Sequence, residues 1–243
     1  MFLNSPLINE GVAREKFKTE HGVFDDFTSQ TIFKLASDGH FEGLQTPISV
    51  GKESNVFAAR RHDHSYVAVK IYRLENCDFN RMYDYIKSDP RFMGLLKRRR
   101  QVIFAWAKRE FRNLLLAREA RVTAPKPLAF KNNVLVEEFI GDEEAAPRLV
   151  SVPPQNPKKF FLLLESEMRK LYKHNLTHGD LSQFNILNFN EKPVLIDFSQ
   201  ATTKENPRFE ELFERDVRIV CNYFNKRGLS LNHTEVMKVI RHE

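Results

Sequence analysis

The stretch H-G-D-L-S-Q-F-N at residues 178–185, followed by I-D-F-S at residues 196–199, decides the fold of this 243-residue chain. Three polar side chains stand in it at fixed intervals: Asp180, then Asn185, then Asp197. Apolar residues follow the Asn and precede the second Asp, so we expect an apolar strand between the two motifs, with Asp197 at the end of a strand. The alternative, that all three are ordinary polar loop residues, is disfavoured by their order and by these apolar flanks.

The spacing matches the loop by which protein-kinase-like enzymes place one base and two metal ligands around a triphosphate. We expect Asp180 to face the attacking hydroxyl group as the catalytic base. Asn185 would supply a neutral oxygen to Mg²⁺ (or Mn²⁺), and Asp197 would supply the carboxylate that holds the metal against the β- and γ-phosphates of ATP. These three residues predict a phosphotransferase site.

The run Y-V-A-V-K-I-Y at residues 66–72 supplies the matching ATP side, since its V-A-V-K resembles the V-A-I-K strand of kinases. Side chains two apart share one face of a strand, so Ala68 and Lys70 point the same way. A small residue leaves room for a purine, and a lysine two residues on can reach the phosphates. Taken alone, a lysine in a strand is usually a solvated edge residue.

A carboxylate partner for Lys70 is available on the segment from Leu96 to Arg121, which we predict to be a helix. Glu110 falls inside an apolar stripe of that helix, where an unpaired charge is costly. Lys70 is therefore its expected partner; the alternative is that the helix twists and leaves Glu110 at the rim. The stripe is formed by Ile103, Trp106, Ala107, Leu114 and Ala117.

Two further segments complete the predicted ATP site. The turn at residues 49–57 holds one glycine, so it is neither a kinase G-x-G-x-x-G loop nor a Walker A loop, but its hydroxyl, ammonium and N–H groups can hold phosphates. The strand 134–141 leads into a hinge, where backbone groups of Glu138 and Ile140 would meet the adenine edge. The predicted loop residues are Ser49, Val50, Gly51, Lys52, Glu53, Ser54 and Val56.

With these motifs the chain resembles the RIO family of atypical protein kinases, and its first subfamily in particular. The resemblance covers residues 24–227. Small-molecule kinases of the aminoglycoside phosphotransferase type share H-G-D-x-x-x-x-N, but they lack the loop S-V-G-K-E-S-N-V-F and the S-Q after the metal aspartate. The motifs that carry the resemblance are residues 49–57, V-A-V-K-I-Y-R at 67–73, R-E-F-R-N-L at 109–114, E-F-I-G at 138–141, H-G-D-L-S-Q-F-N-I-L at 178–187 and I-D-F-S-Q-A at 196–201.

The resemblance implies an α+β, bilobal protein-kinase-like fold in its minimal, archaeal-type form. Gly179 replaces the arginine of H-R-D, and only 46 residues follow Asp197, too few for an activation segment and a peptide-docking subdomain. The family implies a serine/threonine protein kinase and ATPase in small ribosomal subunit maturation, with Asp197 as phosphoryl acceptor. Two alternatives stay open: a small-molecule phosphotransferase, and a non-catalytic, nucleotide-gated ribosome-assembly protein.

Composition limits the setting and the partners. With 42% hydrophobic residues the chain can form a core, and it has no 18-residue apolar run, so we expect no membrane association. Cys77 and Cys221 lie far apart, which favours a reduced, cytoplasmic setting. The net charge of +6 is concentrated from Lys97 to Arg121, which is either a solvated face or a surface for rRNA of the small-subunit precursor. We expect no DNA partner, and the sequence leaves the oligomeric state open.

The chain divides into four predicted parts. Residues 1–46 form a helical extension with Thr28 or Ser29 as the helix cap. Residues 47–137 form an ATP-binding lobe, in which the polar segment 76–96 is a mobile insertion. Residues 138–142 form the hinge, and residues 143–243 form a mainly helical lobe with the catalytic loop and the metal site.

Overall fold

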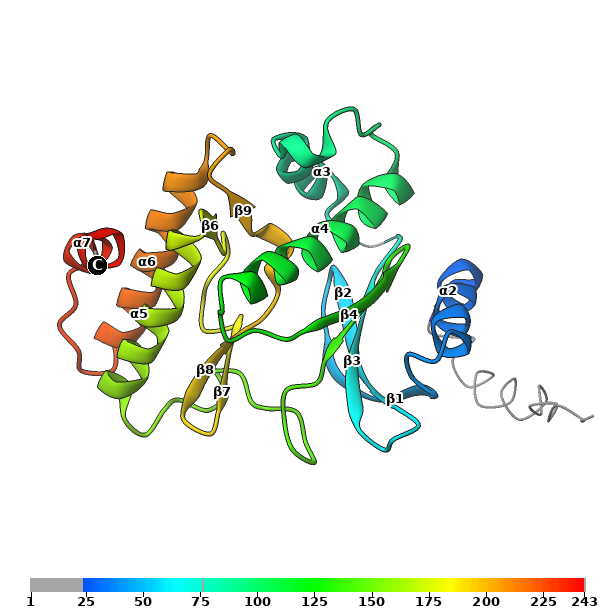
Figure 1. Cartoon of the computed structure of the whole chain (residues 1–243), viewed down its shortest axis with the longest axis horizontal. Helices are drawn as coiled ribbons and strands as arrows, with labels where there is room; N and C mark the ends of the chain where they lie inside the picture. Colours follow the sequence, from blue (N-terminus) through cyan, green and yellow to red (C-terminus); the bar gives the residue numbers. More distant parts are fainter. Residues whose placement is uncertain (1–23, 76, 243) are drawn as a thin grey trace, which may run out of the picture.

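The computed structural model describes residues 24–75 and 77–242, which form two lobes joined by the segment after residue 138 (Figure 1). Residues 1–23 of the predicted helical extension lie outside this range. The N-terminal lobe is a five-stranded antiparallel sheet in the order β1-β2-β3-β5-β4. Its strands are β1 (Gly43–Val50), β2 (Ser54–Arg60), β3 (Tyr66–Tyr72), β4 (Pro127–Lys131) and β5 (Val134–Glu138).

The helix α2 (Asp26–Ser37) lies beside this sheet, with Ile32 and Leu35 buried against it. Its cap is Asp25, not Thr28 or Ser29, because the Asp25 carboxylate accepts the Thr28 backbone N–H at 3.0 Å. The helical extension that we expected to reach residue 46 ends earlier, since β1 begins at Gly43 and pairs with β2.

The segment 76–96, expected to be a mobile insertion, contains the helix α3 (Phe79–Lys87) and the short 3₁₀ helix η1 (Pro90–Phe92). Met82 and Ile86 stand four residues apart on one face of α3 and are buried against the neighbouring helix. The sequence analysis missed this helix although its pattern is helical, since Phe79, Met82, Tyr83 and Ile86 stand at i, i+3, i+4 and i+7 and pack in one cluster.

The long helix α4 (Arg99–Glu119) crosses the space between the lobes (Figure 1). It begins three residues later than predicted, because Arg98 has an extended backbone and acts as its N-cap residue. The predicted apolar stripe is buried throughout, from Ile103 to Ala117, and Glu110 is fully buried within it. The alternative position of Glu110 at the rim is therefore wrong.

The C-terminal lobe packs helices around a large apolar core, in which Phe160, Leu164 and Phe224 are almost fully buried. Among the described residues, no helix is long and apolar enough to cross a lipid bilayer. The elements are α5 (Pro157–Lys173), β6 (Leu176–Thr177), β7 (Ile186–Phe189), β8 (Lys192–Leu195), η2 (Phe198–Gln200), β9 (Thr202–Thr203), α6 (Phe209–Asn225) and α7 (His233–His242).

The hairpin of β7 and β8 positions Asn185 and Asp197. Ile186 pairs with Leu195, and the Ile196 N–H donates to the Asn185 carbonyl oxygen at 3.1 Å. The eleven residues between Asn185 and Asp197 therefore fold back on themselves, and the two side chains emerge at the same end of the hairpin.

Candidate active site

A cleft of about 750 Å³ lies between the sheet of the N-terminal lobe and the β7–β8 hairpin. Most of the predicted site residues line it. Glu110 lies behind the wall, and Asp180 stands beside the cleft next to Asn185. The lining residues that the sequence predicted are Ser49, Val50, Gly51, Lys52, Glu53, Ser54, Val56, Ala68, Lys70, Glu138, Ile140, Asn185 and Asp197.

Lys70 connects two carboxylates at the inner end of the cleft. Its Nζ lies 2.7 Å from Glu110 Oε1 and 2.9 Å from Asp197 Oδ1. Burial would lower the pKa of Lys70, but the two carboxylates raise it, so the ammonium group stays charged. The predicted ion pair between β3 and α4 is present, and Lys70 also pairs with Asp197.

Tyr72, which sequence reasoning missed, completes the environment of Glu110. Its hydroxyl donates to Glu110 Oε2, while Lys70 donates to Oε1. Burial raises the pKa of Glu110, and these two donors favour its charged form. Tyr72 follows Lys70 by two residues on the same face of β3, which was the available signal. We call Lys70, Tyr72, Glu110 and Asp197 the cleft cluster.

Asp197 and Asn185 offer oxygen atoms that suit a hard cation. The Asp197 side chain keeps 37% of its surface exposed, and its Oδ1 accepts the Ser199 hydroxyl at 2.7 Å. Enclosure in the cleft raises its pKa, but Lys70 and Ser199 lower it to about 2, so the group is a carboxylate. The Asn185 amide nitrogen donates to Asp180, which leaves its carbonyl oxygen for a cation. One carboxylate and one amide oxygen fit Mg²⁺, which takes its other ligands from phosphates and water.

Asp180 is held by two amide groups. Its Oδ2 accepts Asn185 Nδ2 at 3.2 Å and Gln200 Nε2 at 3.1 Å. Burial raises the pKa of Asp180, and Asp197 adds to this rise. A carboxylate whose pKa moves toward neutrality is a better proton acceptor near neutral pH, so the position suits a general base.

Asp216 on α6 fixes the backbone on both sides of Asp180, and the sequence analysis missed it. Its Oδ2 accepts the Gly179 N–H at 2.7 Å and its Oδ1 accepts the Leu181 N–H at 2.9 Å. Thr177 donates its hydroxyl to the same carboxylate. Asp216 lies on the apolar stripe that includes Leu212 and Val220, so the argument applied to Glu110 would also have identified it.

Gly179 has a structural reason to be glycine. Its φ is +74°, and a Cβ atom there would lie 2.7 Å from the Gln200 carbonyl oxygen. The arginine that protein kinases carry at this position of H-R-D would therefore clash with the segment after Asp197. Glycine at position 179, in place of the arginine of H-R-D, is therefore required by the packing of this loop.

The phosphate loop is closed by contacts that the sequence did not indicate. The Gly51 N–H donates to the Ser54 carbonyl oxygen at 3.0 Å, which makes the turn between β1 and β2. Arg148, from the segment before α5, donates to the Ser49 hydroxyl at 2.9 Å and also lines the cleft. A guanidinium group from the C-terminal lobe thus fastens the loop across the cleft.

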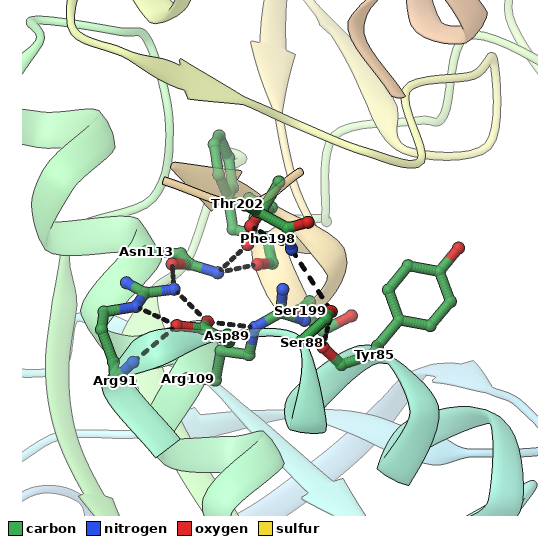
Figure 2. A network of polar contacts seen from close by, with 11 residues as sticks. Tyr85, Ser88, Asp89, Arg91, Arg109, Asn113, Phe198, Ser199 and Thr202 are labelled. Atoms are coloured by element: carbon green, nitrogen blue, oxygen red, sulfur yellow. Dashed lines mark hydrogen bonds and ion pairs between the residues drawn. The ribbon is translucent and has the colours of Figure 1, made fainter. Parts of the chain in front are cut away.

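A second set of buried polar residues, which we call the anchoring network, contacts the chain that follows Asp197, at Phe198 and Ser199 (Figure 2). Asp89 accepts Arg91 Nη2 at 2.7 Å and Arg109 Nε at 3.0 Å. Arg109 Nη1 also donates to the Ser199 carbonyl oxygen at 2.8 Å. Asn113 Nδ2 donates to the carbonyl oxygens of Phe198 and Ala201, and its Oδ1 accepts from Arg91.

This network corrects the reading of the basic run between Lys97 and Arg121. Arg109 is 0% exposed, so it belongs to the interior and cannot contribute to an RNA surface. Arg112 is half-buried and lies over the Phe92 ring, 5.7 Å from its centroid. Residues 97–100 are exposed.

Comparisons with known proteins agree with this geometry. A family model described as RIO domain matches residues 55–237. The chain is 44% identical over 215 residues to the RIO-type serine/threonine-protein kinase Rio1 of Haloferax volcanii, covering 88% of this chain and 74% of that protein. It is 40% identical over 228 residues to Rio1 of Methanocaldococcus jannaschii, covering 93% and 78% respectively.

A solved structure of Rio2 kinase from Chaetomium thermophilum, in a complex described as ADP/Mg²⁺-phosphoaspartate, matches the fold with a TM-score of 0.67 at 23% identity. The match covers 88% of this chain and 66% of that one. The expected α+β kinase-like fold, with an antiparallel sheet followed by a helical lobe, is confirmed.

Proposed function

Because this chain belongs to the RIO family and is a RIO-type serine/threonine-protein kinase, we propose that its cleft binds ATP with Mg²⁺ and transfers or hydrolyses the γ-phosphoryl group. The observation that carries this proposal is Lys70, which joins Glu110 and Asp197 within 2.9 Å at the inner end of the cleft. A buried, charged lysine between two carboxylates is positioned to meet the phosphates of a nucleotide.

Asp197 and Asn185 would hold the Mg²⁺ ion, which neutralises charge on the phosphate oxygens when it is bound. Lys70 binds the phosphates, and Glu110 keeps the lysine extended toward them. The loop from Ser49 to Val56 covers the phosphates, and backbone groups of Glu138 and Ile140 meet the adenine edge. Asp180 accepts the proton of the attacking hydroxyl group.

Asp197 is also the proposed phosphoryl acceptor. One of its carboxylate oxygens attacks the γ-phosphorus, the bond to the β–γ bridging oxygen breaks, and ADP leaves with that electron pair. Water then cleaves the acyl phosphate, which restores the carboxylate and releases inorganic phosphate. The sum of the two steps is ATP hydrolysis.

The test is ATP turnover by the wild type, Asp180→Asn and Asp197→Asn in the presence of Mg²⁺. We expect Asp180→Asn to lose roughly 10²- to 10⁴-fold in protein-substrate phosphorylation while ATP still binds, because the base touches the acceptor and not the nucleotide. Hydroxylamine should release labelled phosphate from the wild type after turnover, and Asp197→Asn should lose this signal. Wild-type turnover by Asp180→Asn would contradict the assignment.

A role in small ribosomal subunit maturation, in the cytoplasm, is the second part of the proposal, and the exposed residues 97–100 support it. Arg99 Nη1 donates to the Glu75 carbonyl oxygen, and Arg100 lies over the Phe27 ring. Arg98 is exposed and makes no side-chain capping bond, so it is the residue whose charge can be removed with least damage to the fold.

The partner is tested by the salt dependence of binding to small-subunit rRNA. Arg98→Gln should weaken binding to all RNA sequences alike and lower the log–log salt slope by roughly one, since one phosphate contact is lost. Lys192→Gln, on the exposed turn side of the β7–β8 hairpin, is the matched control and should change nothing. An unchanged slope for Arg98→Gln would move the RNA surface elsewhere.

A further inference from the structure

Glu137, the residue before the hinge on β5, has no role in the mechanism above, yet it lines the same cleft. It is only 8% exposed. Within the described residues, no hydrogen bond or ion pair is found for its carboxyl group. Burial raises its pKa to about 8, and the nearby Glu110 adds to this rise. A buried carboxyl group without a partner is costly, so its position in a ligand cleft indicates that a ligand group completes it.

The sheet register fixes where the carboxyl group points. Glu137 pairs directly with Ala68, and Lys70 pairs with Leu135 on the same strand pair. Side chains two apart share a face, so Glu137 stands on the cleft face beside the small residue that leaves room for the base. Lys70 and its phosphates lie farther along β3. The charged groups that act on Glu137 are Lys70, Glu110 and Asp197.

The chain direction places Glu137 deeper in the cleft than the hinge. The Glu138 N–H already donates to the Lys126 carbonyl oxygen, and the Ile140 carbonyl oxygen already accepts the Ala146 N–H. A base whose outer edge meets the remaining hinge groups turns its inner edge toward Glu137. For a purine, that inner edge carries the substituent at C6 and the N7 atom.

The chemistry of this edge differs between purines. Adenine presents an N6 amine donor and an N7 acceptor, whereas guanine presents the O6 and N7 acceptors. A protonated carboxyl group offers one O–H donor and one carbonyl acceptor. It complements adenine at both atoms and can match guanine at only one.

We propose that Glu137 is a base-specificity residue that accepts a hydrogen bond from the adenine N6 amine and donates one to N7. This inference rests on the proposed binding of ATP in the cleft. Glu137 takes no part in phosphoryl transfer, and its contribution is to select adenine over 6-oxo purines. A glutamine at this position has the same donor and acceptor in a fixed neutral form.

The test combines base analogues with two variants, using calorimetric titration with Mg²⁺. The ligands are ATP, 7-deaza-ATP, which lacks the N7 acceptor, and inosine triphosphate, which has an oxygen at C6. The wild type should bind each analogue about tenfold more weakly than ATP, as expected for the loss of part of a bidentate contact. Glu137→Gln should keep these ratios. Glu137→Met, which has similar length and no donor, should bind ATP and 7-deaza-ATP equally.

A surface control is Glu119→Gln at the exposed end of α4, which should reproduce the wild-type ratios. Thermal unfolding of each variant reports whether it is folded, and Glu137→Met should be at least as stable as the wild type, because it removes an unpartnered buried carboxyl group. If Glu137→Met keeps the wild-type preference for ATP over 7-deaza-ATP, the inference is overturned while ATP binding stands. If the wild type binds no ATP, the proposed function itself fails.

Discussion

Two polar clusters contact the segment 197–202, and they differ in which of their charged groups remain open to the cleft. The cleft cluster meets the segment at the Asp197 side chain, through Lys70 at 2.9 Å. The anchoring network meets it at backbone carbonyl oxygens, through Arg109 and Asn113 (Figure 2). One contact holds a side chain that faces the cleft, and the other holds the backbone behind it.

The cleft cluster holds more carboxyl groups than ammonium groups. A single ammonium group, Lys70, faces the carboxyl groups of Glu110 and Asp197 and influences that of Glu137. Burial raises the pKa of Glu110 and of Glu137. An excess of carboxyl groups beside an open cleft is what a metal ion and a nucleotide can complete.

The chain itself pairs the charges of the anchoring network, and among the described residues Arg109 Nη2 is its one buried side-chain atom without a hydrogen-bond partner. Burial would raise the pKa of Asp89, but Arg91 and Arg109 lower it, so it is a carboxylate held between two guanidinium groups. In the rest of the network, Arg109 donates to the Ser199 backbone carbonyl oxygen and Arg91 donates to Asn113. The comparison teaches that buried charge alone does not mark a functional residue: the cluster that faces the cleft is suited to bind a ligand, and the closed one stabilises the loop.

The largest effect is expected from a substitution that breaks the anchoring network. Arg109→Met leaves Asp89 buried with one partner fewer, so the free energy of unfolding should fall by about 3–5 kcal/mol, as for other broken buried pairs. Chemical denaturation measures it, with Lys108→Met, the exposed neighbour on α4, as the control that should stay near the wild type. A wild-type unfolding free energy for Arg109→Met would refute the structural role of the network.

The second largest effect is expected from substitutions that break the cleft cluster. Lys70→Met and Glu110→Gln should each lower ATP turnover roughly 10²- to 10³-fold, as when one preorganised electrostatic group is lost. The double variant should be little worse than either single variant, because the two residues act together. Fully additive losses would show that they act independently, and Lys126→Met, an exposed lysine, should be neutral.

A smaller effect comes from His178, whose Nε2 lies 3.0 Å from the Ile196 carbonyl oxygen just before Asp197. Burial lowers its pKa to about 4 from an ordinary value of 6.5. Between these values the unfolded chain binds the proton and the folded chain does not, so the stability from this group falls as the pH falls. We expect a loss of about 2 kcal/mol between pH 6.5 and about pH 5.

Denaturation curves at several pH values measure this loss. His178→Gln cannot take up a proton in the unfolded state, so the part of the slope between pH 6.5 and about pH 5 that comes from this group should disappear. An identical pH slope in the wild type and in His178→Gln would mean that the folded protein tolerates the imidazolium form.

The sequence predicted the parts of the site that depend on local spacing. The interval between Asn185 and Asp197 is closed by one hairpin, and Ala68 and Lys70 share a face because a strand alternates. Glu110 was predicted to pair with Lys70 because a charge on an apolar helical stripe requires a partner. In each case one secondary-structure element, or one charge requirement, was enough.

The remaining parts depend on contacts between residues far apart in the chain. Arg109 was grouped with surface charges, but its bonds to Asp89 and to the Ser199 carbonyl oxygen, 90 residues away, place it in the interior. Glu137 stands in a strand with another glutamate after it, so the alternation alone did not show that the Glu137 carboxyl group is the buried one, while that of Glu138 accepts the Lys126 N–H. The Asp25 cap was missed because four residues with capping side chains, Asp25, Asp26, Thr28 and Ser29, stand within five positions.

The central claim is that the cleft cluster, not the anchoring network, binds the metal–nucleotide complex. The most direct test measures the dissociation constant of ATP with Mg²⁺ and with a chelator in the wild type, Asp197→Asn and Arg109→Met, at a temperature where all three are folded. We predict that Mg²⁺ tightens ATP binding in the wild type and in Arg109→Met, and that Asp197→Asn loses this tightening. An Asp197→Asn variant with the full wild-type Mg²⁺ dependence would contradict the claim.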